Sequence, residues 1–166
     1  MVRFSPGVAQ SCHELLVLAK KHALAPKHLL STFTHIGAIP SDKVWGIAQE
    51  LNWAYVTDEG LLAPTIKGER LLAYTCYPQL LRQMLLDYID TERPAWLQNA
   101  SSGRAKVLMF VRAEIAQVFV EAELAQGVDE QTVAFWDALA ALARGQKNDR
   151  INEVGRTGER LSLGYE

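Results

Sequence analysis

The chain has 166 residues, of which 49% are hydrophobic and 22% are charged, and its formal net charge is −2. This composition is typical of a globular protein with one or two domains and excludes an intrinsically disordered chain. A net charge close to zero gives no general attraction to nucleic acid or to an anionic membrane, so any such binding must come from a local patch.

The two cysteines, Cys12 and Cys76, form no spaced pattern. The sequence therefore predicts neither a disulfide framework nor a zinc site. The first residues lack the apolar core of a signal peptide, and no apolar run approaches the ~20 residues that span a bilayer. We therefore expect a cytoplasmic protein in a reducing compartment, with no membrane as a partner.

The first helix is expected to begin at Ser11, after an irregular lead over residues 1–9. Ser11-Cys-His-Glu14 fits the capping box S-x-x-E, in which the two side chains satisfy free N–H groups at the helix start. This helix should end near Ala23. Pro26 suits the first position of the next helix, where the missing N–H of proline is not needed.

Residues 29–51 are expected to form two helices separated by a turn. Apolar residues recur at helical spacing as far as Ile36, and Gly37 ends that run. Ser41 is a candidate N-cap for the second helix. The second helix carries an apolar stripe of the width that faces a core. This stripe consists of Val44, Ile47, Ala48 and Leu51.

A strand-like pattern follows over residues 53–56, and Asp58-Glu59-Gly60 is a hairpin signal before a return strand at 61–63. Thr65 can cap one more helix, which runs to Leu72. Helix, turn, helix, two-strand wing and helix is the order of a winged helix-turn-helix. The segment L-x-A-P-T-I-K-G-E-R-L-L resembles the wing and following helix of many such domains, which commonly read L-x-T-x-x-G-x-x-L-L.

From Pro78 onward the pattern is helical, beginning with an amphipathic helix that carries Leu81, Met84, Leu85, Tyr88 and Ile89 on one side. Residues 104–124 are expected as two helical pieces with a break near 111–112. A further helix, which Asp129 caps, follows these positions. The inward residues are Val133, Trp136, Leu139, Ala140 and Ala143, of which Trp136 and Leu139 are expected to be buried with Phe119.

We therefore predict a mainly α fold, a winged helix-turn-helix with a small β wing followed by a helical module. The expected boundaries are residues 1–76 for the winged domain and 77–150 for the helical module. Residues 145–148 form an expected polar link, Gly-Gln-Lys-Asn. Residues 151–166 are expected to be a linker helix or the start of a truncated C-terminal domain.

Short motifs in the second half follow a pattern that is found in a known family. They are Pro94-Ala-Trp96, Gly103-Arg104, Glu114-Ile-x-Gln117-Val-Phe119-Val-Glu121, Thr132-Val-Ala-Phe-Trp136-Asp, Gly155-Arg-Thr-Gly-Glu159 and the final Gly164-Tyr165-Glu166. This region resembles the segment that precedes and enters the protein NO VEIN C-terminal domain of bacterial proteins. Such proteins often occur beside restriction and anti-phage genes. The resemblance implies the N-terminal region of a defence protein whose C-terminal effector, suspected to be nuclease-like, is absent.

No catalytic pattern in the sequence is complete, so we expect no enzyme, no catalytic residues and no cofactor. His13-Glu14 begins the zinc motif H-E-x-x-H, but the fifth position is Val17. The glycines of residues 155–158 lack the preceding strand that a phosphate-binding loop requires. His28 and His35 are spaced to share one helix face, but such histidines are usually solvated, so we expect no metal site.

DNA recognition is the function that the sequence favours, because the second helix of a winged helix enters the major groove. Residues 1–40 contain four Lys or Arg and one Glu, a local charge of +3. Gln49 is suited to read adenine, and the Ser41 hydroxyl to bind phosphate. We expect weak binding through the DNA backbone. The predicted DNA-binding residues are Lys20, Lys21, Lys27, His28, Ser41, Lys43 and Gln49.

The alternative function is protein docking or dimerisation through the same domain. Asp42, Glu50 and the acidic wing tip would repel DNA phosphates. Trp45 lies near the expected outer face of the second helix, and exposed tryptophan is typical of protein interfaces. A continuous positive stripe across the lysines would favour DNA, whereas a neutral apolar patch around Trp45 would favour a protein partner or a homodimer.

Overall fold

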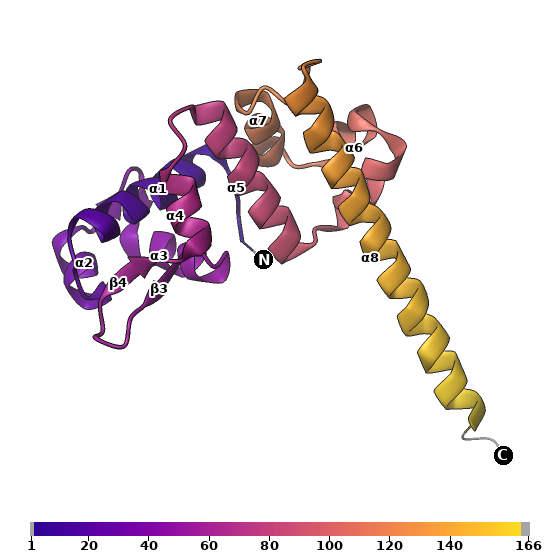
Figure 1. Cartoon of the computed structure of the whole chain (residues 1–166), viewed down its shortest axis with the longest axis horizontal. Helices are drawn as coiled ribbons and strands as arrows, with labels where there is room; N and C mark the ends of the chain where they lie inside the picture. Colours follow the sequence, from indigo (N-terminus) through magenta and orange to yellow (C-terminus); the bar gives the residue numbers. More distant parts are fainter. Residues whose placement is uncertain (1, 164–166) are drawn as a thin grey trace. The chain divides into compact units, whose positions relative to one another are not determined.

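The computed structural model describes residues 2–163 of the chain, with side chains as far as Thr157 except at residue 155. The fold is mainly helical with a small β wing, as predicted (Figure 1). Two compact units are present, one of residues 1–92 with 112–126 and the other of residues 93–111 with 127–166. The expected boundary at residue 76 does not coincide with either limit, and the final Gly164-Tyr165-Glu166 motif lies outside the described residues.

The first unit contains a winged helix followed by two further helices. Its elements are α1 (Pro6–Lys21), α2 (Pro26–Thr32), β1 (His35–Ile36), β2 (Ile39–Pro40), α3 (Ser41–Glu50), β3 (Ala54–Val56), β4 (Leu62–Pro64), α4 (Ile66–Leu72), α5 (Tyr77–Glu92) and α7 (Ala113–Glu121). In the wing, β3 and β4 pair antiparallel with Tyr55 opposite Ala63. The Leu62 N–H donates to the Leu24 carbonyl over 2.9 Å, so the connection after α1 lies along the other edge of β4.

The predicted starts of α2 and α4 agree with the structure, whereas the predicted start of α1 does not. Pro26 begins α2, and the Thr65 hydroxyl oxygen accepts from the Gly68 N–H at 3.1 Å at the start of α4. The first helix, however, begins at Pro6, where the Ser5 hydroxyl oxygen accepts from the third helical residue. The predicted capping box at Ser11 and the irregular lead over residues 1–9 are therefore wrong. Ser5 followed by proline supplies the N-cap and first-turn residues that a helix start prefers.

The connection between α2 and α3 also differs from the prediction. The helix expected to reach Ile36 ends at Thr32, and the β1–β2 hairpin separates α2 from α3. Gly37 adopts a φ of +60° in the two-residue turn, a conformation that glycine adopts at low cost. Ser41 is the first helical residue of α3 and makes no side-chain cap, because Pro40 occupies the N-cap position.

The core of the first unit forms around Trp53, which is fully buried just after α3. Its ring packs edge-on against Phe4, with the centroids 6.4 Å apart, and Phe4 stacks on Tyr88 of α5 at 5.0 Å. The expected apolar face of α5 is confirmed, since Leu81, Met84, Leu85, Tyr88 and Ile89 are all buried. Residues of α5 thus complete the core of the winged helix, which explains why the first compact unit extends beyond residue 76.

The second unit consists of the 3₁₀ helix η1 (Ala95–Ser102), α6 (Arg104–Phe110) and α8 (Glu130–Leu163). The predicted break near 111–112 is confirmed, because α6 ends at Phe110 and α7 begins at Ala113. Asp129 caps α8 as predicted, since its Oδ1 accepts from the Thr132 N–H at 2.9 Å.

The inward face and the length of α8 both differ from the prediction. Thr132, Phe135, Leu139 and Ala143 are buried, whereas Val133 is exposed and Trp136 is only half-buried. Phe119, the expected neighbour of Trp136, is buried in the first unit. The polar link expected at residues 145–148 is wrong, because α8 continues through it. A single glycine costs a helix only about 1 kcal/mol, and no proline interrupts the segment.

Candidate nucleic-acid interface

The outward surface of α3 is the part of a winged helix that normally meets DNA. Val44 and Ala48 turn into the core, while Asp42, Lys43 and Gln49 are exposed, as the helical spacing predicts. Gly46 and Glu50 are exposed on the same helix. The exposed side chains of α3 therefore include one cation and two carboxylates, so this surface carries no positive charge overall.

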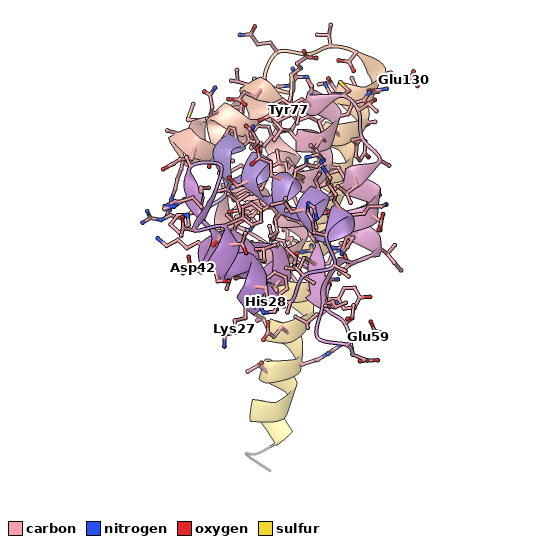
Figure 2. All side chains as sticks on the ribbon, turned by 90° about the vertical axis from the view of Figure 1, so that its left-hand side faces the viewer. Lys27, His28, Asp42, Glu59, Tyr77 and Glu130 are labelled. Carbon is pink, nitrogen blue, oxygen red and sulfur yellow. The ribbon has the colours of Figure 1, made fainter. Side chains whose placement is uncertain are left out.

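Three predicted cations are available to a ligand. Lys21 at the end of α1, Lys27 at the start of α2 and Lys43 at the start of α3 are exposed, and no ion pair to any of them is found within residues 2–163. Figure 2 shows Lys27, His28 and Asp42 on the same side of the unit. These ammonium groups come from helix ends, where winged helices often contact phosphates.

Lys20 does not belong with the available cations. Its Nζ lies 2.5 Å from Oε2 of Glu69 on α4, an ion pair that joins side chains 49 positions apart. The Glu69 carboxylate offsets the charge that a phosphate would meet at Lys20. Sequence reasoning could not identify this pair, because only the tertiary fold brings α1 and α4 together.

Ser41 is also misplaced for the role that the sequence suggested. The residue is only 3% exposed, and its backbone N–H donates to the Thr34 carbonyl at 3.1 Å. A hydroxyl buried in this way cannot meet a phosphate unless α3 moves, so we remove Ser41 from the interface. His28 and Gln49 remain exposed and keep their places in it.

The charges around the interface limit how strongly it can attract DNA. Residues 26–64 contain two lysines, Lys27 and Lys43, and four carboxylates, which gives a net charge of 2 − 4 = −2. The carboxylates are Asp42, Glu50, Asp58 and Glu59, all of them exposed. The positive surface is therefore confined to the helix ends and does not continue along α3 to the wing.

Near the candidate interface, the exposed large apolar side chains lie at the wing and not around Trp45. Trp45 is half-buried, whereas Tyr55, Val56 and Ile66 are 47%, 43% and 92% exposed. Tyr55 and Ile66 line a groove of about 520 Å³ at the junction of β3 and α4. Sequence reasoning missed this patch, although the apolar first residue of a helix at Ile66 was a signal.

A second groove, of about 470 Å³, lies between α1 and the α4–α5 connection. It is lined by His13, Glu14, Cys76 and Tyr77, among others. Burial lowers the pKa of His13, an effect that the nearby Glu14 carboxylate partly opposes, and His13 Nε2 is buried without a hydrogen-bond partner. These groups do not form a metal site, since no three His, Cys, Asp or Glu side chains of the described residues cluster as ligands.

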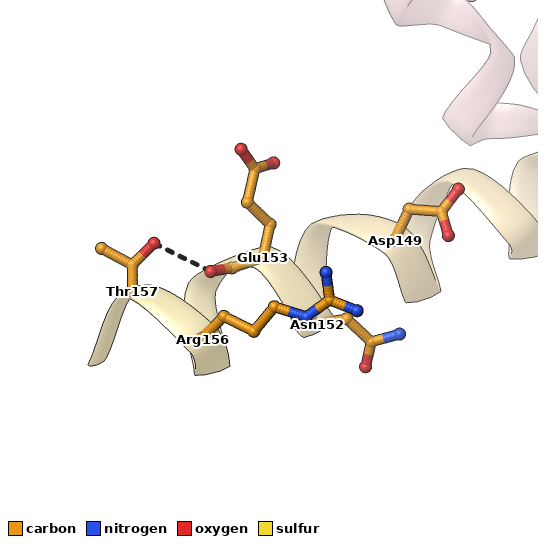
Figure 3. A pocket seen from close by; sticks show the side chains of 5 residues that line it. All are labelled: Asp149, Asn152, Glu153, Arg156 and Thr157. Carbon is orange, nitrogen blue, oxygen red and sulfur yellow. Dashed lines mark hydrogen bonds between the residues drawn. The ribbon is translucent and has the colours of Figure 1, made fainter. Parts of the chain in front are cut away.

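The surface along the second half of α8 is not an enclosed site. Figure 3 shows that its side chains, from Asp149 to Thr157, come from one helix. The one hydrogen bond drawn there runs from the Thr157 hydroxyl to the Glu153 carbonyl, at 2.9 Å within the same helix. His28 and His35, which the sequence spacing placed on one helix face, do not share a helix. His28 lies in α2 and His35 lies in β1.

Comparison with known proteins assigns no family to the chain. No family model, no curated protein and no solved structure matches the chain. Within residues 2–163, none of the helices is long and apolar enough to cross a membrane.

Proposed function

We propose that the first unit is a non-enzymatic recognition module that binds duplex DNA weakly through backbone phosphates. The observation that supports this proposal is the exposure of Lys21, Lys27 and Lys43 at three helix ends of a winged helix, without ion pairs within residues 2–163. In such folds the recognition helix enters the major groove while the preceding helix crosses the DNA backbone, so lysines at the starts and ends of these helices lie near phosphates. The resemblance to NO VEIN-associated proteins adds restriction or anti-phage defence as the biological setting that we propose.

The charges define what kind of binding to expect. Lysine ammonium groups attract phosphates without reading sequence, so affinity depends on counterion release. With three phosphates neutralised, log K should fall with log salt with a slope of about −2.7. Asp42 and Glu50 flank the exposed Gln49 on α3 and oppose deep insertion into the groove, so discrimination between sequences should be poor.

The test is a salt titration of a short fluorescent duplex with the full chain, followed by anisotropy. Lys27→Ala with Lys43→Ala should flatten the salt slope by up to about 2 and weaken all duplex sequences alike. The matched control is Lys106→Ala with Lys147→Ala, which removes two exposed lysines from the second unit. Absence of binding even at about 50 mM salt would overturn the proposal.

Protein docking is the second candidate function. It is favoured by the exposed Tyr55, Val56 and Ile66 at the wing, and by the net negative charge of residues 26–64. Exposed apolar side chains that lie next to each other are typical of protein interfaces. A positively charged DNA-binding surface would not require them.

A further inference from the structure

The two edges of the wing differ in the partners of their backbone groups. Strand β4 lies between β3 and Leu24, whose carbonyl accepts from the Leu62 N–H at 2.9 Å. Strand β3 has β4 on one side only. On that side the Thr57 N–H donates to the Leu61 carbonyl at 2.8 Å, and the Thr65 N–H donates to the Trp53 carbonyl at 2.9 Å.

These bonds define which backbone groups of β3 point away from β4. In an antiparallel pair, successive residues alternate between facing the partner strand and facing outward. Since Trp53 and Thr57 face β4, Ala54 and Val56 present their N–H and C=O groups at the outer edge. No other backbone partner for these groups is found among residues 2–163. An edge of this kind can pair with a further strand.

Apolar side chains accompany the open edge. Tyr55 and Val56 lie on β3 itself, and Ile66 begins α4 and shares a groove with Tyr55. The same groove contains Asn52, Lys67 and Glu69, and the Glu69 carboxylate is already paired with Lys20. No ion pair to Lys67 is found in the described part of the chain, while the wing tip carries the exposed Asp58 and Glu59.

We propose that the outer edge of β3 is a homodimer interface, in which β3 pairs antiparallel with β3 of a second copy. The proposal rests on the docking candidate and does not require DNA binding. Of the symmetric registers, the one that uses both outward residues places Ala54 opposite Val56 of the second copy and Tyr55 opposite its own counterpart on the two-fold axis. Two Tyr55 rings then meet as a non-hydrogen-bonded cross-strand pair, in which side chains approach most closely.

Charge complementarity favours a second copy over an unrelated strand. In this register residue 52 lies opposite residue 58 of the second copy. Asp58 of the second copy therefore approaches the groove that holds Asn52 and Lys67. The symmetry repeats this contact, so that both acidic wing tips face a lysine. At the same edge, the carboxylates of Asp58 and Glu59 would repel the phosphates of DNA.

The strand is short, so the dimer should be weak and dependent on concentration. Sedimentation equilibrium of the full chain should show reversible monomer and dimer. Val56→Pro removes an N–H that faces outward and leaves the bonds to β4 intact, a substitution that edge strands tolerate. We expect it to weaken dimerisation at least tenfold. Ile66→Lys should do the same, and because Ile66 is 92% exposed this change should not affect folding.

The register is tested by exchanging charges. Lys67→Glu and Asp58→Lys should each weaken the dimer, and the double variant should restore it, since each carboxylate again meets an ammonium group. A double variant that does not recover would overturn the register. A chain that stays monomeric, or dimerises equally well with Val56→Pro and Ile66→Lys, would overturn the interface. Neither result would count against DNA binding, because Lys27 and Lys43 are unchanged in all five variants.

Discussion

The indole Nε1–H of Trp53 donates a hydrogen bond to Oδ2 of Asp87 over 2.9 Å and so joins the end of α3 to α5. Asp87 is only 4% exposed, and its other oxygen accepts from Arg70 at 3.1 Å and from Gln83 at 3.0 Å. A buried carboxylate is tolerated when it is paired and fully hydrogen-bonded. This cluster therefore fixes α4 and α5 against the central tryptophan of the winged helix.

Replacing the buried carboxylate should destabilise the first unit. In Asp87→Ala the Trp53 N–H loses its partner, and a buried donor without a partner costs about 1–3 kcal/mol. The variant should unfold at a lower urea concentration, as followed by tryptophan fluorescence. Glu50→Ala, which removes an exposed carboxylate from α3, should leave the midpoint unchanged. Equal midpoints for wild type and Asp87→Ala would show that the cluster adds nothing to stability.

The neighbouring aromatic residues of α8 should differ in their contribution to stability. Phe135 is buried, so Phe135→Ala should cost about 3–5 kcal/mol. Trp136 is half-buried, and the Arg104 guanidinium lies over its ring at 5.6 Å. An exposed cation–π contact of this kind adds about 0.5–1 kcal/mol, so Trp136→Ala should cost less than Phe135→Ala. Thermal denaturation of both variants measures the two losses of stability. A larger loss for Trp136→Ala would contradict the observation that Phe135, and not Trp136, is buried.

Local signals in the sequence were sufficient for much of the fold. Pro26, Thr65 and Asp129 were recognised because a helix start depends on a few consecutive residues. Ser11 misled the prediction because Ser11-Cys-His-Glu14 fits the capping box, whereas the true cap, Ser5, lacks the glutamate of that pattern and is indicated only by the proline that follows it. On α8, Phe135 and Trp136 are adjacent and both apolar, so periodicity alone could not decide which one faces inward.

The contacts between residues far apart in the sequence were beyond sequence reasoning. The bond from Trp53 to Asp87 joins positions 34 apart, and the ion pair from Lys20 to Glu69 spans 49. Nothing in the local sequence of Lys20 distinguishes it from Lys21, which is available to a ligand. The exposure of the predicted α3 residues was correct because it follows from helical spacing. The burial of Ser41 depends on the β1–β2 hairpin, which the sequence did not predict.

The two thiols should differ strongly in reactivity. Cys12 is fully buried, and burial raises its pKa from 9.0 to about 12, whereas Cys76 is exposed. Since the thiolate is the reactive form, a disulfide reagent near pH 8 should modify about one thiol in the native chain and both after denaturation. Cys76→Ser should abolish the native reaction. Rapid native labelling of that variant would contradict the burial of Cys12.

Cys12 should also make the folded chain less stable at high pH. Its pKa in the folded state, about 12, lies above the unfolded value near 9.0. The unfolded chain therefore releases this proton first, so the stabilisation is fully present below pH 9 and is lost as the pH rises toward 12. The measurement is the urea midpoint between about pH 8 and pH 11 for wild type and Cys12→Ala. A fall of equal size in both proteins would assign the effect to other groups.

His13 should make the first unit less stable in acid. Burial lowers its pKa below 6.5, and the Glu14 carboxylate opposes this shift only in part. The unfolded chain thus binds the proton more readily, so stability is fully present above pH 6.5 and falls as the solution becomes more acidic. His13→Gln should reduce the difference in stability between about pH 7.5 and pH 5, as urea denaturation would show. The exposed His22→Gln serves as the control, and an equal reduction by that variant would contradict the role of His13.

The ion pair of Lys20 with Glu69 gives a sharper test of the proposed DNA contact than the removal of a lysine. Glu69→Gln leaves the Lys20 ammonium beside Lys21 without its carboxylate partner. If these helix ends meet phosphates, DNA binding should strengthen and the salt slope should steepen by up to about 1. Glu130→Gln makes the same change in net charge on the second unit and separates this local effect from a general one. The two variants are compared by anisotropy of one duplex over about 50–200 mM salt. Equal slopes for both variants would mean that the end of α1 does not lie on DNA, and the contact would then be limited to the starts of α2 and α3.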